Sequence, residues 1–207
     1  MIKNIVFDMG NVLVNYDDRI VCRRFIKDEK ELELVRTAVF VSPEWIMLDM
    51  GVISDEEALK SMQSRLPDDH AREMAALCMN HWHEYCMDGI EEMVNVIKEL
   101  KDQGYGIYLC SNASMRLLQC YKQVIPGIEY FDGVLFSAEV KCIKPQKEIY
   151  LHLFERFKLK PEPEECFFID DLQRNIDGAK ACGMEGYCHK DGNVESLKKV
   201  LRGLQNK

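Results

Sequence analysis

The feature that most constrains the fold is an alternation of short apolar runs with amphipathic segments, which starts at Ile5 and resumes after Asp88. The apolar runs are too short for helices, whereas the amphipathic segments repeat apolar residues three or four positions apart. Strands and helices that alternate in this way form a parallel sheet with helices on both faces. The predicted strands are 5–7, 105–110, 133–136, 165–169 and 186–188, and the predicted helices are 90–101, 115–124, 145–157, 176–182 and 194–204.

A helical block interrupts this alternation after the first predicted strand. Leu32, Val35 and Val39 recur at helical spacing, and Ser54 with Glu57 has the pattern of a capping box at a helix start. We therefore predict an α/β fold with a Rossmann-like parallel sheet core, residues 1–16 and 87–207. An all-helical cap, residues 17–86, is inserted into this core.

Composition and charge restrict the classes of function. The 207 residues are 47% hydrophobic, which is enough for a packed core, and the net charge of −8 argues against binding nucleic acid. We expect no membrane segment, because there is no apolar run of about 18 residues and no signal-peptide pattern. Nine irregularly spaced cysteines suggest reduced thiols and a cytoplasmic location. A monomer or a small homo-oligomer is expected.

Polar residues follow several of the predicted strands. Asp8 follows the first strand, Ser111-Asn112 the second and Asp170-Asp171 the fourth, while Lys144 lies between the third strand and the next helix. Each has an ordinary explanation as a helix cap, a surface charge or a turn residue. However, parallel strands deliver their carboxyl ends to one edge of a sheet, where α/β proteins bind ligands. Their joint occurrence therefore predicts a functional site at that edge.

These segments resemble the four ordered motifs of the haloacid dehalogenase-like hydrolases. A segment similar to the one after the family's last motif follows at residues 175–179, and the resemblance extends over essentially the whole chain. Two segments are similar to a branch of sugar-phosphate phosphatases typified by bacterial α-glucose-1-phosphate phosphatase. They are the first motif, with its Asp-x-Gly-Asn-Val form, and residues 45–56 in the cap. The four motifs are residues 8–12, 109–112, 143–145 and 168–171.

The resemblance implies a Mg²⁺-dependent phosphatase that acts on a small phosphorylated metabolite of the sugar-phosphate class. It implies that Asp8 attacks phosphorus to form an aspartyl-phosphate, with Lys144 paired to Asp8 and to a phosphate oxygen. Mg²⁺ would lie between Asp8, the Gly10 carbonyl and Asp170, an oxygen-rich site of the kind this ion prefers.

Further roles are implied for residues around this centre. The Ser111 hydroxyl, the Asn112 amide and the backbone amides of Met9 and Gly10 would bind the phosphate. Asp171 would support the metal through water or hold Lys144. Asn175 would contact the residues that bind the metal.

Gly10 departs from the wider family, most of whose phosphatases carry an aspartate at this position as a general acid and base. Such a group contributes roughly 10² to 10⁴ in rate, so its absence predicts a slow enzyme or a proton from elsewhere. Two alternatives stay open: a 2-haloacid dehalogenase, which needs no such acid, and a catalytically weak binding or regulatory protein. The paired carboxylates Asp170 and Asp171 argue against a metal-free dehalogenase.

A zinc site at Cys78, His81, His83 and Cys86 is disfavoured, because His83 would face away from the others on a helix.

Overall fold

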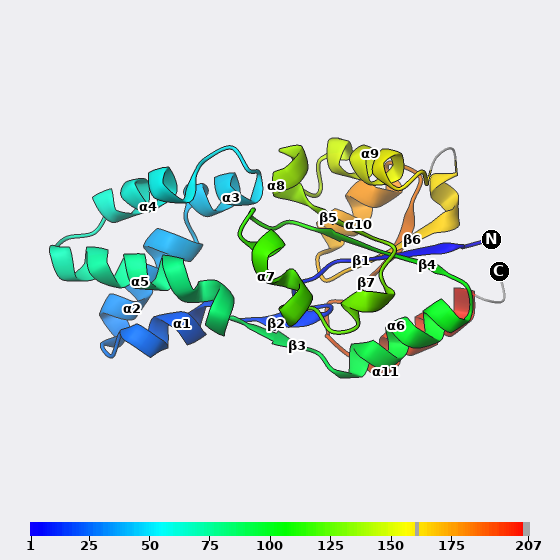
Figure 1. Ribbon diagram of the computed structural model, residues 1–207, viewed down its shortest axis with the longest axis horizontal. Coiled ribbons are helices and arrows are strands. Elements are labelled where there is room, and N and C mark those ends of the chain that lie inside the picture. The colour runs from blue at the N-terminus through cyan, green and yellow to red at the C-terminus, as the bar shows by residue number, and fades with distance from the viewer. Residues whose placement is uncertain (160–161, 205–207) are drawn as a thin grey trace.

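A five-stranded parallel sheet forms the centre of the protein, which is described here from a computed structural model covering residues 1–159 and 162–204. The strand order is β5-β4-β1-β6-β7, as in a Rossmann-like fold (Figure 1). The α/β fold class predicted from the alternating pattern is therefore confirmed. The strands are β1 (Asn4–Phe7), β4 (Gly106–Ser111), β5 (Gly133–Phe136), β6 (Cys166–Asp170) and β7 (Glu185–Cys188).

The central strand β1 explains the continuous apolar run at the start of the sequence. It pairs with β4 on one side and β6 on the other, so that Phe7 lies between Leu109 and Ile169. Ile5, Val6 and Phe7 are fully buried. Both faces of a central parallel strand are covered, so these three consecutive positions are all apolar rather than alternately apolar and polar.

Helices cover the two faces of the sheet with separate apolar cores. On one face, α6 (Glu92–Asp102) and α11 (Val194–Leu204) pack over Ile5 and Phe7, and α7 (Leu117–Val124) adds Leu117 to the same core. On the other face, α9 (Lys147–Arg156) and α10 (Gln173–Lys180) pack over Val6 and Phe168. Among the described residues, no helix combines the length and the apolar composition that crossing a bilayer requires.

Five helices form the inserted cap, on the left in Figure 1. An antiparallel ribbon of β2 and β3 joins the cap to the core, and its three-residue strands are too short for the sequence pattern to have predicted them. The capping box is present, since Ser54 and Glu57 each accept a hydrogen bond from the other's backbone N–H. The elements are α1 (Asp18–Phe25), α2 (Glu29–Phe40), α3 (Pro43–Asp49), α4 (Asp55–Ser64), α5 (Asp69–Tyr85), β2 (Val14–Tyr16) and β3 (Met87–Gly89).

Helix α6 begins at Glu92 instead of Ile90, and two further core helices, α7 and α9, also begin later than predicted. Helix α7 begins at Leu117 instead of Met115, because residues 114–117 form a turn closed by a hydrogen bond from the Leu117 N–H to the Ser114 carbonyl. Helix α9 begins at Lys147 instead of Pro145, because residues 143–146 form a turn closed by a hydrogen bond from the Gln146 N–H to the Ile143 carbonyl. The differences at α7 and α9 fall beside strand ends that carry polar motif residues.

A partly buried ion pair connects the cap helices to one another. The Arg65 guanidinium donates to both carboxylate oxygens of Glu44, at 2.8 and 2.7 Å, and the Ser61 hydroxyl donates to the same carboxylate at 2.6 Å. These hydrogen bonds, Arg65 first, lower the pKa of Glu44 to about 2 from its ordinary 4.5. The folded protein therefore holds Glu44 in its charged form.

We predict that Glu44→Ala lowers the free energy of unfolding by about 2 kcal/mol near neutral pH, because Arg65 and Ser61 lose a charged acceptor. The pKa of Glu44 is lowered on folding, so this contribution is complete above about pH 4.5 and is lost as the pH falls toward about 2. Urea unfolding at about pH 7 and about pH 3 should show the difference between variant and wild type shrinking in acid.

The control is Glu195→Ala, which removes an exposed ion pair with Lys198 and should cost less than about 1 kcal/mol. A Glu44→Ala effect as small as that of the control, or one that does not depend on pH, would contradict the assignment.

Candidate active site

A tight turn after β1 places Asp8 at the carboxyl edge of the sheet. The Asp8 backbone N–H donates to the carbonyl of Ile169 at 2.8 Å, which continues the pairing of β1 with β6. The chain then reverses at Asn11, whose φ of 55° is in the left-handed region. The Met9 N–H donates to Asp8 Oδ1 at 2.7 Å and thereby orients the carboxylate.

Lys144 lies between two carboxylates below this turn. Its Nζ is 2.8 Å from Asp8 Oδ1 and 2.7 Å from Asp170 Oδ2, and the whole residue is only 2% exposed. Burial lowers the pKa of Lys144, but Asp8 and Asp170 raise it by more, so the pKa lies above its ordinary value. Burial raises the pKa of Asp8 to about 7, although Lys144 opposes this shift. The ion pair expected between Lys144 and Asp8 is present.

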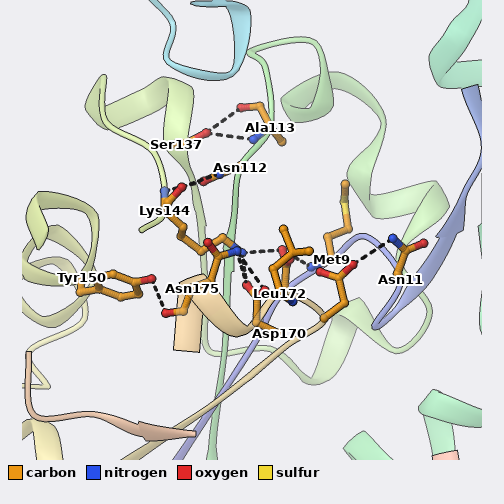
Figure 2. A network of polar contacts seen from close by, with 12 residues as sticks. Met9, Asn11, Asn112, Ala113, Ser137, Lys144, Tyr150, Asp170, Leu172 and Asn175 are labelled. Carbon is orange, nitrogen blue, oxygen red and sulfur yellow. Dashed lines mark hydrogen bonds and ion pairs between the residues drawn. The ribbon is translucent and has the colours of Figure 1, made fainter. Parts of the chain in front are cut away.

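Asp170 is the most completely held carboxylate of the site. Besides Lys144, it accepts hydrogen bonds from the Leu172 N–H at 2.9 Å and from Asn175 Nδ2 at 2.9 and 3.0 Å (Figure 2). The Tyr150 hydroxyl in turn donates to the Asn175 carbonyl at 2.7 Å. Asn175 therefore contacts a proposed metal ligand, as the sequence analysis expected.

The Asn112 side chain fixes the backbone of Lys144. Its Nδ2 donates to the Lys144 carbonyl at 3.1 Å, and its Oδ1 accepts the Lys144 N–H at 2.7 Å. The next residue, Ala113, donates its N–H to the Ser137 hydroxyl at 2.9 Å, as Figure 2 also shows. The segment after β4 thus positions the loop that carries Lys144, a role that the sequence did not reveal.

Three carboxylates converge at the edge of the sheet. Asp8, Asp170 and Asp171 offer oxygens that all lie within 4.8 Å of one another. Asp171 accepts a hydrogen bond from Asn11 Nδ2 at 3.0 Å, whereas Lys144 contacts Asp170; the alternative that Asp171 holds Lys144 is therefore wrong. One ammonium facing three carboxylates leaves excess negative charge, which a cation bound by oxygen ligands would offset. The donor set fits Mg²⁺.

A cavity of about 290 Å³ opens above these residues, between core and cap. The cap and the connecting ribbon contribute aromatic side chains, Trp45, Trp82 and Tyr16, together with the carboxylate of Asp49. Among the predicted site residues, only Asp170 does not line the cavity; it is fully buried beneath it. The predicted residues that do line it are Asp8, Met9, Gly10, Ser111, Asn112, Lys144, Asp171 and Asn175.

Sequence reasoning missed several lining residues, among them Asp49, Tyr16, Trp82 and Arg174. Trp45, in the cap segment 45–56 that resembles the sugar-phosphate phosphatase branch, also lines the cavity. The other cap residues carry no local signal, because their position depends on how five helices pack over the sheet.

The cysteines and histidines within and directly after α5, all of them in the described part of the chain, do not gather into a cluster that could hold a metal. Cys78 and Cys86 are buried free thiols, and His81 Nδ1 lies 3.0 Å from the Glu84 carboxylate. Within the described ranges, the one group of side chains arranged to hold a metal is the carboxylate cluster at the edge of the sheet.

Comparison with known families agrees with this geometry. Residues 2–183 match the family model of the haloacid dehalogenase-like hydrolases. The match spans most of the chain and all four motifs. The protein belongs to the haloacid dehalogenase-like hydrolase family.

Individual relatives are more distant. The chain is 26% identical over 186 residues to a sesquiterpene phosphatase of Aspergillus oryzae, covering 89% of this chain and 88% of the relative. It is also 26% identical over 208 residues to a D-ribitol-5-phosphate phosphatase of Bacteroides thetaiotaomicron, and this match covers 93% of this chain and 94% of the relative.

Among solved structures, a predicted hydrolase of this family from Porphyromonas gingivalis superposes with a TM-score of 0.73 at 25% identity, covering 98% of both chains. An enzyme of the family from Bacteroides thetaiotaomicron, in complex with magnesium and inorganic phosphate, superposes with a TM-score of 0.71 at 22% identity. That match covers 90% of this chain and 93% of the other. The likeness shows that the fold is shared along almost the whole chain.

We predict that Asn112→Ala lowers the free energy of unfolding by about 2 kcal/mol, because two backbone groups of the buried Lys144 loop lose their partners. Urea unfolding monitored by circular dichroism measures the change. The control is Gln146→Ala on the exposed side of the same loop, where one hydrogen bond to Ile143 is lost and less than about 1 kcal/mol is expected. Equal effects of the two substitutions would show that Asn112 does not hold the loop.

Proposed function

We propose that this protein is a Mg²⁺-dependent phosphatase that hydrolyses a small phosphorylated metabolite through an aspartyl-phosphate on Asp8. The observation that carries the proposal is the buried ion pair of Lys144 with Asp8 and Asp170 at the floor of the cavity. Phosphoryl transfer depends mainly on positioning and on neutralising charge, and this arrangement supplies a fixed carboxylate beside a fixed cation.

The phosphate would bind to hydrogen-bond donors around Asp8. We assign to this role the Lys144 ammonium, the Ser111 hydroxyl, the Asn112 backbone amide and the backbone amides of Met9 and Gly10. All five residues line the cavity, and Ser111 and Lys144 are almost fully buried. Donors in a site shielded from water interact with an oxyanion more strongly than they would at the surface.

The residues assigned to hold Mg²⁺ are Asp8, the carbonyl of Gly10 and Asp170, with Asp171 supporting it through water. When bound, the ion supplies the positive charge that lets an anionic phosphate approach the Asp8 carboxylate. Asn175 keeps Asp170 oriented through its two hydrogen bonds. Asn11 holds Asp171 at the edge of the site.

The proposed reaction uses Asp8 twice. A carboxylate oxygen of Asp8 attacks phosphorus and displaces the oxygen of the ester, which forms the aspartyl-phosphate. Water then attacks the same phosphorus and restores the carboxylate. Lys144 stays paired with Asp8 and balances the charge on the phosphate oxygens during both steps.

The cavity suits a small substrate, and a sugar phosphate is the class we propose. Its aromatic walls, Trp45 and Trp82, offer surfaces for the apolar face of a sugar ring, while Asp49 and Arg174 offer polar contacts. Relatives named for D-ribitol 5-phosphate and for phosphorylated carbohydrates agree with this class. We propose a cytoplasmic location as well, because all nine cysteines are free thiols.

The carboxylate cluster favours phosphoryl transfer over dehalogenation. A dehalogenase needs a nucleophilic carboxylate, but the buried Asp170 and the neighbouring Asp171 would only add repulsion beside that nucleophile. A metal-dependent phosphatase uses the same carboxylates as ligands.

We predict that Asp8→Asn lowers the turnover of p-nitrophenyl phosphate by at least about 10³-fold, because it removes the nucleophile. Chelation of divalent metal should abolish wild-type turnover, and added Mg²⁺ should restore it. Asp177→Asn, an exposed substitution on α10, is the control and should leave activity unchanged. Phosphate release that survives in Asp8→Asn or in chelator would overturn the proposal, and halide release from a 2-haloacid in chelator would favour the dehalogenase.

A further inference from the structure

The proposed reaction needs a proton donor that the turn after β1 does not provide. The ester oxygen leaves with an electron pair and must gain a proton, and the attacking water must lose one. Residue 10, the second after Asp8, is a glycine and has no side chain that could transfer it. The donor must come from another group that lines the cavity.

Most titratable groups around the cavity already have another role or cannot donate a proton. Asp8 is the proposed nucleophile, and Lys144 is held between Asp8 and Asp170. Asp171 accepts from Asn11 and lies in the carboxylate cluster. Arg174 does not lose its proton in proteins. Burial raises the pKa of Tyr16 well above its ordinary value, which makes its hydroxyl a poor acid.

Asp49 is the remaining group, and the cap delivers it to the cavity. It is the last residue of α3 and lines the same cavity as Asp8 and Gly10. Burial, first, and the charge of Asp8 raise the pKa of Asp49 to about 7, whereas the Ser114 backbone N–H opposes the shift. A carboxyl group in such surroundings can carry a proton near neutral pH and release it again.

The backbone around Asp49 is anchored to the core. The Ser137 hydroxyl donates to the Asp49 carbonyl, and the same oxygen accepts the Ala113 N–H. Two residues further, Gly51 has a φ of 64°, and a Cβ there would lie 2.3 Å from the Ala138 carbonyl oxygen. The chain can approach the core this closely only with glycine. This end of α3 is therefore fixed against the sheet edge rather than loosely attached to the cap.

We propose that Asp49 is the general acid and base of this enzyme, supplied by the cap in place of a residue in the turn after Asp8. The inference rests on the proposed phosphatase function. In the first step, Asp8 attacks phosphorus, the bond from phosphorus to the ester oxygen breaks, and that oxygen takes the proton of Asp49 as the alcohol leaves. In the second step, water gives a proton to Asp49 and attacks phosphorus, and the electron pair of the broken bond returns to Asp8.

The space beside Gly10 offers a direct rescue experiment. A Cβ built on Gly10 meets no atom within 4 Å, and its φ is not in the left-handed region. The Cβ of an aspartate at this position would therefore meet no neighbouring atom. In Gly10→Asp, a carboxyl group would enter the same cavity from the core side.

The test measures Asp49→Asn on esters whose leaving groups differ in acidity. Turnover of an alkyl phosphate such as glycerol 1-phosphate should fall by roughly 10² to 10⁴-fold, because a poor leaving group needs the proton. With p-nitrophenyl phosphate, whose leaving group needs no proton, the first turnover should release p-nitrophenol in a burst of one equivalent, followed by slow steady-state release. The slow phase reports the loss of the base that activates water.

The double variant Gly10→Asp/Asp49→Asn should recover turnover of the alkyl phosphate by at least about tenfold relative to Asp49→Asn. Glu56→Gln, an exposed acid on α4 of the cap, is the control and should match wild type. The unfolding midpoint of Asp49→Asn should stay at the wild-type value, because the substitution keeps the shape of the side chain and the backbone anchor.

Three results would overturn the inference. These are an unchanged turnover of the alkyl phosphate, an equal fall of the first-turnover rate for every ester, and a rise in KM with unchanged kcat, which would make Asp49 a binding residue only. If Asp8→Asn also remains active, the phosphatase proposal itself fails. If Asp8→Asn is inactive and Asp49→Asn gives one of the three results, only the role of Asp49 fails.

Discussion

The buried ammonium of Lys144 is the interaction on which the rest of the site depends. Its two contacts, to Asp8 and Asp170, join the ends of the adjacent central strands β1 and β6. Removing the ammonium would leave both carboxylates buried without a compensating charge, and breaking a buried ion pair in this way typically costs about 3–5 kcal/mol. The surrounding hydrogen bonds therefore keep all three groups in place. Asn112 fixes the backbone of Lys144, and Asn175 orients Asp170.

Even with Lys144 in place, the edge of the sheet is too negative to accept a phosphate. Asp171 and the cap residue Asp49 add carboxylates around a single ammonium. The physical solution is a cation with oxygen ligands, which turns the clustered carboxylates from a barrier into a binding site. Burial and the nearby charge of Asp8 favour a proton on Asp49, the carboxylate carried by the cap. The clustering of carboxylates at one edge of the sheet thus affects the proposed metal site, the nucleophile and the proton donor together.

The cap and the core form this site together. The Arg116 guanidinium, just before α7, pairs with Asp55 of the cap and donates to the Asn80 carbonyl at 2.9 Å. Ser137 bonds to the end of α3, and the ribbon of β2 and β3 forms the connection between the two parts. The core supplies the chemistry of phosphorus, whereas the cap supplies aromatic walls and a carboxylate. In the proposed mechanism, the same inserted segment then serves both substrate choice and proton transfer.

The sequence predicts the part of this arrangement that depends on strand ends. Asp8, Ser111 and Asp170 follow apolar runs, and the topology of a parallel sheet brings such ends together without further information. The contacts of long side chains cannot be predicted in this way. Lys144 contacts Asp170 rather than Asp171, because Asp170 is the last residue of the buried strand, whereas the Asp171 side chain turns toward Asn11. Asp49 could not be predicted at all, because only the packing of α3 against residues 137–138 brings it to the cavity.

The central claim is that Asp8 becomes covalently phosphorylated. The most direct measurement is to mix the enzyme with Mg²⁺ and a phosphate ester, quench in acid within the first turnover, and analyse the peptides by mass spectrometry. We predict one added phosphoryl group on the peptide that contains Asp8, and its loss when the quench is delayed until substrate is exhausted. Substrate hydrolysis without any phosphorylated peptide, or with the phosphoryl group on another residue, would contradict the account.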